Sequence, residues 1–410
     1  MYIKRHMENV LNDPAHLRGV MAVTGSRQTG KSTLVHELFR DRSHTEISLD
    51  DMGLRELAKT DPKVFLAKYP TPLVIDEVQY AAELFPYLKI HVDQTHEKGA
   101  FYISGSQRFN MMKNLSESLA GRVGIFELMG LSMRELAGDG FCEPFIPTGA
   151  YLGKRTPSAN TLDYRGIWSL IHRGGYPELH ENPALDWQAY YNDYVNTYIE
   201  RDVHQLENVG DEVKFYQFMR VVAAHSGNLL NVEGMARDVG IKRDECERWL
   251  SVLRASNLIF LLGPYHSNLI KRAVKTPKMY FMDTGLMAFL TRWLDEDQLE
   301  TGAMAGAFFE TFVVCEILKS FYNCGLDPRN YLYFYRDIDG YEVDVVIAAN
   351  GKLHPIEIKK GAAVSKGDIN AFRQLDKDTA NVRGGGGIVC MADTLQPLTE
   401  TDSIIPIRYV

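Results

Sequence analysis

The sequence predicts an α/β protein built from several domains, and three observations carry that prediction. At 410 residues the chain is too long for one ordinary hydrophobic core. Its N-terminal third alternates short apolar runs with helical patterns, which is typical of a parallel sheet with flanking helices. The remainder is first mainly helical and then rich in strands, which predicts a helical middle followed by a C-terminal αβ domain.

The composition is that of an ordinary globular protein. Apolar residues make up 45% and charged residues 24%, and the net charge of −8 argues against a broadly basic surface. The five cysteines show no metal-ligand spacing, so we expect reduced thiols and a cytoplasmic location. The first residues contain no apolar leader, and no run approaches the roughly 18 apolar residues of a membrane-spanning helix.

The first segment with a chemical signature follows a short buried strand at 19–24. The sequence GSRQTGKST then matches G-x-x-x-x-G-K-[ST], and a helical pattern begins immediately after it. Backbone N–H groups of such a loop hold phosphates, with Lys31 reaching the β and γ oxygens and Ser32 binding Mg²⁺. The predicted ATP-binding residues are Gly25, Ser26, Arg27, Gln28, Thr29, Gly30, Lys31, Ser32 and Thr33.

A second strand, PLVIDE at 72–77, ends in two acids, which is the form of a Walker B motif. Asp76 is predicted to hold Mg²⁺, either directly or through water. Glu77 is predicted to orient and polarise the water that attacks the γ-phosphate. A glutamate at this position favours hydrolysis over a passive nucleotide switch.

The next apolar strand, from Ala100, ends at Ser104 and Ser106. This arrangement resembles the AAA-type ATPases, whose sensor residue ends the strand after Walker B, and either serine matches. The resemblance also implies an arginine that stabilises transition-state charge, for which Arg122 or Arg108 is the candidate, in cis or from a neighbouring subunit. A contribution in trans would imply a homo-oligomer. We take 1–140 as the ATPase domain.

The middle of the chain contains two predicted units. Residues 141–210 form a helical lid, and 211–295 give a helix, a tight turn at Gly240, a second helix and apolar strands, the pattern of a winged helix. From Arg248 to Lys278 there are six Lys/Arg residues and no acid, which favours DNA as a partner. Winged helices also serve as protein-binding or lid modules, and that alternative stays open.

The C-terminal part, 296–410, contains a hairpin with charged strands. If Asn350 and Gly351 form its two-residue loop, Asp344 lies opposite Glu357 in a non-bonded pair with Cα atoms about 4.5 Å apart. Facing like charges destabilise a sheet unless they hold a cation. Lys359 projects on the same side as Glu357, so the hairpin predicts a Mg²⁺ site beside an ammonium group.

A helix before the hairpin carries Glu310 on an otherwise apolar face. Glu310, Asp344, Glu357 and Lys359, in that order, resemble the PD-(D/E)XK nuclease superfamily, although valine replaces the proline of its motif. By that resemblance Asp344 and Glu357 are metal ligands, Glu310 is an accessory acid, and Lys359 is the catalytic lysine. This predicts a restriction-endonuclease-like αβ fold for 296–410.

The whole chain also resembles a family of prokaryotic predicted ATPases that combine an AAA-type domain, a winged-helix middle and a nuclease-like C-terminal domain. The shared segments are SRQTGKST, LVIDEVQ, RGGYPE, PKMYFMDTGL and EVDVV followed by IEIK. The resemblance implies ATP binding and hydrolysis, with nuclease action by analogy to the superfamily. Our first hypothesis is a Mg²⁺-dependent ATPase that acts on DNA and presents it to the C-terminal nuclease-like site. The alternative is an ATP-driven regulatory or signalling switch that binds a protein partner or DNA without cleavage.

Overall fold

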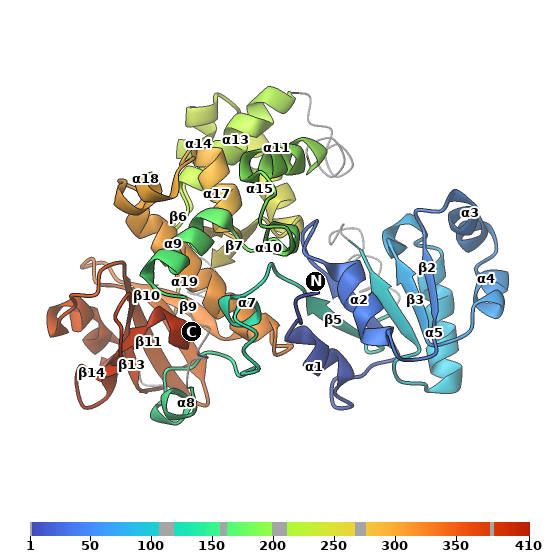
Figure 1. The fold of residues 1–410 in the computed structure, drawn as a ribbon, viewed down its shortest axis with the longest axis horizontal. Coiled ribbons are helices and arrows are strands. Elements are labelled where there is room, and N and C mark those ends of the chain that lie inside the picture. The colour runs from blue at the N-terminus through green and yellow to red at the C-terminus, as the bar shows by residue number, and fades with distance from the viewer. Residues whose placement is uncertain (1, 106–118, 156–161, 199–210, 267–275, 378–380) are drawn as a thin grey trace.

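The structure is a computed structural model of the chain, and it describes residues 2–105, 119–155, 162–198, 211–266, 276–377 and 381–410. Three sheets follow one another along the sequence, with a helical region between the first and the last (Figure 1). The first sheet and its helices lie to one side of the remainder of the molecule in this view. In the described ranges no helix is long and apolar enough to cross a membrane.

The N-terminal sheet is parallel and has the strand order β2-β3-β4-β1-β5, which confirms the predicted parallel sheet. Its strands are β1 (Val20–Thr24), β2 (Thr45–Ser48), β3 (Leu73–Asp76), β4 (Phe101–Ser104) and β5 (Val123–Glu127). The accompanying helices are α1 (Met7–Asn12), α2 (Lys31–Phe39), α3 (Met52–Thr60), α4 (Pro62–Lys68) and α5 (Leu84–Thr95).

This sheet is apolar on both faces because helices cover each of them. Alternate residues of a strand point to opposite faces, so Val20 and Ala22 enter one core while Met21 and Val23 enter another. All residues of β1 are buried. Such a continuous apolar run is what a central parallel strand requires. The buried strand also fixes the position of the loop that follows its carboxyl-terminal end.

The middle of the chain is mainly helical, as predicted. The short helix α7 (Met133–Leu136) closes the N-terminal part. The helices of the middle are α8 (Gly149–Lys154), α9 (Tyr164–Arg173), α10 (Pro177–Glu181), α11 (Trp187–Tyr198), α13 (Glu212–Ala224), α14 (Val232–Val239) and α15 (Arg243–Ala255). Three short strands, β6 (Asn228–Leu229), β7 (Ile259–Leu262) and β8 (Lys278–Phe281), form an antiparallel sheet in the order β6-β8-β7. The aromatic stripe of α11 is buried, so these rings belong to the core.

The helix α17 (Thr284–Thr291) ends the middle part, and the C-terminal part contains α18 (Glu296–Thr301), the long helix α19 (Ala305–Tyr322) and a mixed sheet. Its strands are β9 (Leu332–Arg336), β10 (Glu342–Ala349), β11 (Lys352–Lys359), β12 (Val382–Arg383), β13 (Gly386–Cys390), β14 (Gln396–Pro397) and β15 (Asp402–Pro406). The 3-10 helix η3 (Pro328–Asn330) precedes β9, and η4 (Lys366–Lys377) follows β11.

The middle and C-terminal parts share one hydrophobic core. Buried side chains from α13, α15, α17, α19 and the β9–β11 strands form a single cluster that runs across position 295. The predicted domain boundary at position 295 therefore divides the sequence but does not divide the hydrophobic core. A side chain from the middle sheet can therefore reach the C-terminal sheet.

Nucleotide-site geometry, carboxylate cluster and comparisons

The loop after β1 has the geometry of a phosphate-binding loop. Gly30 has a φ of 85° immediately before α2 begins at Lys31, so the helix N-terminus points its free N–H groups toward the loop. Gly25 has a φ of 151°, and a Cβ atom there would lie 2.2 Å from the carbonyl oxygen of Leu128. Only glycine allows this approach between the loop and the residue after β5.

Asp76, at the carboxyl end of β3, contacts one polar side chain from the start of α2 and one from the end of β4. Ser32 Oγ donates to Asp76 Oδ2 at 2.8 Å, and Ser104 Oγ donates to Asp76 Oδ1 at 2.5 Å. Lys31 Nζ donates to the Ser26 carbonyl at 2.7 Å, which holds the ammonium over the loop. Of the two serines considered as sensors, Ser104 thus contacts Asp76, while Ser106 lies outside the described residues.

Glu77 follows in a left-handed conformation, with a φ of 53°, which turns its side chain out of the strand direction. The Gln79 amide donates a short hydrogen bond to its carboxylate. Burial raises the pKa of Glu77, and the nearby Asp76 carboxylate adds to this, while Gln79 and Lys31 oppose it. A carboxyl group with a raised pKa suits a base that accepts a proton from water. We did not predict a role for Gln79, although it ends the shared segment LVIDEVQ, two residues after Glu77.

A cavity of about 370 Å³ adjoins the phosphate-binding loop. Its walls come from the first residues of the chain, the loop itself, the start of α2 and α10. They are formed by Tyr2, Ile3, Arg5, Gln28, Gly30, Thr33, Leu131, Pro177, Glu178 and Glu181. This volume lies within the range of small-molecule sites, and its position beside Gly30 suits the base and ribose of a nucleotide.

Arg122 lies at the amino-terminal end of the parallel strands, whereas a cis role at this site requires the carboxyl-terminal end. It precedes β5, and its carbonyl accepts from Val20 at the start of β1, whereas the phosphate-binding loop follows the end of β1. Its Nε donates to Asp93 Oδ1 at 2.8 Å, and both side chains are partly exposed. The predicted cis arginine is therefore corrected, and only a role in trans stays open. Arg108 lies outside the described residues.

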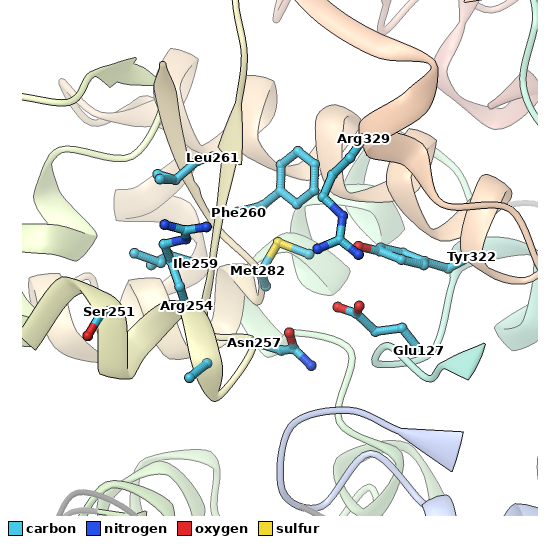
Figure 2. Close-up of a pocket in the computed structure, with 11 residues that line it drawn as sticks. Glu127, Ser251, Arg254, Asn257, Ile259, Phe260, Leu261, Met282, Tyr322 and Arg329 are labelled. Carbon is cyan, nitrogen blue, oxygen red and sulfur yellow. The ribbon is translucent and has the colours of Figure 1, made fainter. Parts of the chain in front are cut away.

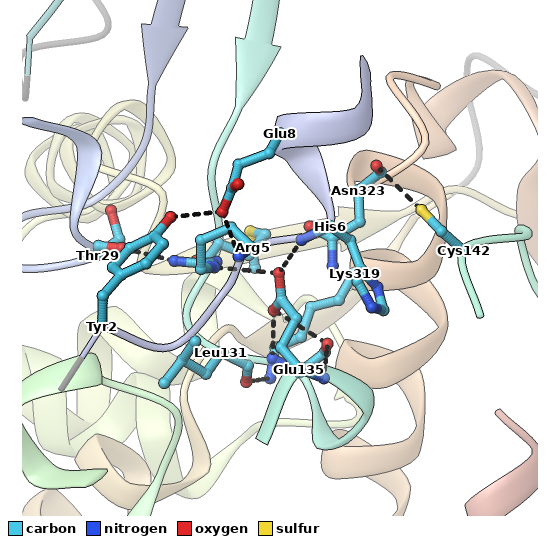
Figure 3. Close-up of polar contacts among 12 residues, drawn as sticks. Tyr2, Arg5, His6, Glu8, Thr29, Leu131, Glu135, Cys142, Lys319 and Asn323 are labelled. Atoms are coloured by element: carbon cyan, nitrogen blue, oxygen red, sulfur yellow. Dashed lines mark hydrogen bonds and ion pairs between the residues drawn. The ribbon is translucent and has the colours of Figure 1, made fainter. Parts of the chain in front are cut away.

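A buried arginine connects the loop to the rest of the molecule, and no sequence pattern pointed to it. Arg5 donates to the Thr29 carbonyl at 2.9 Å, to the Met129 carbonyl at 2.6 Å and to Glu135 at 3.0 Å (Figure 3). Two residues after Met129, the Leu131 carbonyl accepts from Lys319 of α19 at 2.9 Å. A continuous set of polar contacts thus joins the phosphate-binding loop to the C-terminal helix.

The three parts of the chain also meet around a second cavity, of about 400 Å³ (Figure 2). Glu127 comes from the end of β5, Arg254 and Phe260 come from the middle part, and Tyr322 and Arg329 come from the C-terminal part. In Figure 2, Glu127, Tyr322 and Arg329 gather on one side of this cavity, with Arg254 on the other. A cavity lined in part by charged side chains therefore lies between the N-terminal sheet and the middle and C-terminal parts of the chain.

The C-terminal hairpin has the predicted register. Its strands pair from Ala349 with Lys352 to Val345 with Ile356, which places Asp344 opposite Glu357. Asn350 and Gly351 both have positive φ, as a two-residue turn of this kind requires. The hairpin thus carries two carboxylates in facing positions.

The cation that contacts Asp344 was not predicted in this role. Lys278 Nζ, from β8 of the middle sheet, lies 2.6 Å from Glu342 Oε1, 3.2 Å from Glu310 Oε1 and 3.4 Å from Asp344 Oδ1. Tyr280 of the same strand donates to Glu310 Oε1 at 2.7 Å. Sequence analysis placed Lys278 in a DNA-contacting basic segment. It is only 4% exposed, so that assignment is wrong for this residue.

The two facing carboxylates of the hairpin have further partners, one within β11 and one on the backbone. Lys359 Nζ lies 2.6 Å from Glu357 Oε1, and the Ile358 N–H donates to Asp344 Oδ2 at 2.9 Å. Burial, together with the Asp344 charge, raises the pKa of Glu357 to about 8. Burial and the Asp344 charge also raise the pKa of Glu310.

These contacts do not fit the predicted metal site. In the described part of the chain, no group of three or more acid, histidine or cysteine side chains is arranged to hold a metal ion. The physical reason is that Glu310 and Asp344 converge on the Lys278 ammonium, while Glu357 is turned to Lys359. The predicted metal ligands Asp344 and Glu357 and the predicted accessory acid Glu310 are thus all paired with lysines in this structure.

Comparison with protein-family models divides the chain into three matched segments. Residues 17–137 match a model described as an AAA domain. Residues 164–297 and 305–410 match two models described as domains of unknown function, DUF8612 and DUF4143. The N-terminal segment is therefore an AAA-type ATPase domain, a family that uses ATP.

Uncharacterized proteins of Mycobacterium tuberculosis and Mycobacterium bovis are each 27% identical to this chain over 392 residues, covering 95% of it and 80% of the relative. The Walker-type ATPase of Pyrococcus abyssi aligns with 70% of this chain and 96% of its own at 14% identity and a TM-score of 0.42. A Holliday junction branch migration motor of Thermotoga maritima aligns with 58% of this chain and 80% of its own, at 16% identity and a TM-score of 0.28. At these scores the structural likenesses carry no conclusion about function.

Proposed function

We propose that the chain is a Mg²⁺-dependent ATPase that hydrolyses ATP to ADP and phosphate. The observation that carries this proposal is the meeting of Ser32 and Ser104 at Asp76, beside the Lys31 ammonium. A hydroxyl and a carboxylate 2.8 Å apart are the oxygen donors that Mg²⁺ prefers. The AAA domain match covers all four residues.

Each side chain has a distinct role in this proposal. Lys31 leaves the Ser26 carbonyl and pairs with the β and γ oxygens, while Ser32 and Asp76 hold Mg²⁺. The metal supplies positive charge that offsets the charge developing on the phosphate oxygens. Glu77 accepts the proton of the attacking water, and the Gln79 amide keeps its carboxylate oriented.

The test is ATP binding and turnover in three variants. We expect Lys31→Ala to lose both, because the phosphate charge loses its partner. We expect Glu77→Gln to bind ATP but turn over about 10²- to 10⁴-fold more slowly, the range for loss of a general base. Lys98→Ala, at an exposed position of the same domain, serves as the matched control. Turnover that is unchanged in Lys31→Ala contradicts the proposal.

We propose further that the middle part is a winged-helix module and that DNA is its partner. The element order α13-β6-α14-α15-β7-β8 with a three-stranded antiparallel sheet supports this. Arg248 is exposed on α15, although the same helix carries Asp244, Glu245 and Glu247. Lys271, Arg272 and Lys275 lie outside the described residues.

DNA binding is best measured as a function of salt concentration. If Arg248 contacts a phosphate, Arg248→Ala weakens binding to all sequences alike and lowers the slope of log affinity against log salt by about one. Arg243→Ala, a change of the same kind on the same helix, is the matched control; Arg243 contacts Glu233 and Glu247. Binding of equal strength and equal slope in both variants would leave a protein partner as the better proposal.

One observation favours a second candidate function for the whole chain, an ATP-driven switch that binds DNA or a protein partner without cleavage. The nuclease proposal needs free carboxylates for a metal. The contacts of Lys278 with Glu310, Glu342 and Asp344 oppose this. In the switch, ATP acts through the contacts of Arg5 that join the phosphate-binding loop to the middle and C-terminal parts.

A further inference from the structure

We infer that Lys278 is the built-in cation of the C-terminal carboxylate cluster and that this cluster therefore binds no divalent metal and cuts no DNA. The cluster is defined as Glu310, Glu342, Asp344 and Glu357. This inference concerns the C-terminal sheet alone and does not depend on whether the N-terminal domain hydrolyses ATP.

The first support is the convergence of the carboxylates on one point. Oxygens of Glu310 on α19 and of Glu342 and Asp344 on β10 all lie between 2.6 and 3.4 Å from Lys278 Nζ. A metal shared by the same groups would sit at their common centre, about 2.0–2.6 Å from each oxygen. The ammonium already fills that position, and two cations cannot occupy it together.

The second support is the anchoring of Lys278. Its side chain is 5% exposed, and an ammonium group that far from water requires carboxylate partners. Its backbone lies within the middle strand of a sheet, where Lys278 pairs with Leu229 of β6 on one side and Leu262 of β7 on the other. The attachment point of the lysine therefore cannot shift without opening this sheet.

The third support is the count of formal charges. In the described part of the chain, the three carboxylates that contact Lys278, those of Glu310, Glu342 and Asp344, are faced by two cations, Lys278 and Arg336. The formal sum is −1 with Lys278 present. Without Lys278 it is −2, which one divalent cation would complement. The lysine thus supplies the charge that a metal would otherwise bring.

The hairpin register gives the reason for such a lysine. Asp344 and Glu357 face each other across two strands, an arrangement that costs stability unless a cation offsets it. Lys278 approaches Asp344 and Lys359 approaches Glu357, so each member of the pair has its own ammonium. The facing acids serve to attach β8 of the middle sheet to the C-terminal sheet.

The test is Mn²⁺ binding by nucleotide-free full-length protein, followed by electron paramagnetic resonance of the free ion. Every protein carries Asp76→Asn, so that the N-terminal site contributes no binding. We expect no saturable Mn²⁺ binding with Lys278 in place. We expect Lys278→Met to gain at least about tenfold in Mn²⁺ affinity, because removing a unit charge at contact distance unmasks the carboxylates. Adding Asp344→Asn to Lys278→Met should abolish that gain.

Two further arms keep the outcome decisive. Lys352→Met, at an exposed position of β11, is the matched control and should gain nothing. Lys278→Gln and thermal melting of each variant show whether a variant is folded, and if neither Lys278 variant folds, the titration with Lys278 in place still decides. Saturable Mn²⁺ binding that requires Asp344 while Lys278 is present overturns the inference. So does a folded Lys278→Met that gains no Mn²⁺, or Mg²⁺-dependent cleavage of linear DNA that is lost in Asp344→Asn.

Discussion

The guanidinium of Arg5 donates from Nε to Glu135 Oε1 at 3.0 Å, and the two side chains are 3% and 0% exposed. Arg5 stands before the first helix, and Glu135 lies in α7, which follows the last strand of the N-terminal sheet. The same carboxylate group accepts from the Ser132 and His6 N–H groups. The pair therefore fastens the first residues of the chain to the segment that leaves the N-terminal sheet.

Removal of one partner of this pair should destabilise the protein strongly. Arg5→Met leaves Glu135 as a buried charge without its cation, which typically costs about 3–5 kcal/mol. We expect this loss in the free energy of unfolding, measured by denaturant titration. The control is Arg243→Ala, whose ion pairs lie on the surface and whose loss should leave the midpoint unchanged. Equal midpoints for both variants would show that the buried pair contributes nothing.

Acid should destabilise the protein through Glu135. Burial alone would raise the pKa of this carboxyl, but Arg5, His6 and the backbone N–H groups lower it from 4.5 to about 2. Because the folded pKa is lower than the unfolded one, the stabilisation is complete above pH 4.5 and is lost as the pH falls toward 2. The full difference is about 3 kcal/mol. Stability measured against pH should fall less steeply in Glu135→Gln, and parallel curves would contradict this assignment.

Ser104→Ala should slow ATP turnover more than it weakens ATP binding. The hydroxyl donates to Asp76 Oδ1, and a hydrogen bond to a carboxylate contributes about 1.5–3 kcal/mol. If that contribution is needed in the transition state, the turnover number falls about 10- to 100-fold. Ser48→Ala is the matched control, since Ser48 ends the neighbouring strand β2 and its hydroxyl accepts from the Asp50 N–H. A smaller effect in Ser104→Ala than in Ser48→Ala would rule out Ser104 as the sensor.

Arg122→Ala should leave the turnover number of the monomer unchanged. Arg122 is paired with Asp93 at the amino-terminal end of the strands, and the phosphate-binding loop lies at their carboxyl-terminal end. Arg122 therefore cannot contact phosphate in its own chain. The measurement is ATP turnover over a range of protein concentrations, with Asp93→Ala as the matched partner variant. A loss confined to Arg122→Ala at concentrations that favour assembly would establish a role in trans. A loss in the monomer would contradict the position of Arg122.

Local sequence carried much of the fold. The phosphate-binding loop could be predicted because its glycines and Lys31 form one contiguous stretch. Glycine is needed at these positions because the backbone has positive φ or lies close to a neighbouring backbone atom. The hairpin register could be predicted for a similar reason, since Asn350 and Gly351 suit a two-residue turn that fixes every pair beyond it. Both features depend on neighbours within a few residues.

Contacts between distant residues were decided only by the tertiary structure. Lys278 and Asp344 are 66 residues apart, and the sequence gives Lys278 the same appearance as the basic residues around it. Arg5 likewise meets Glu135 across 130 residues. A single charge shows no periodicity. In the sequence, a lysine that will face solvent therefore cannot be told from one that will contact a buried carboxylate, because only packing brings the partners together. The sequence by itself thus determined which acids face each other in the hairpin, and only the packing of the middle sheet decided which cation they hold.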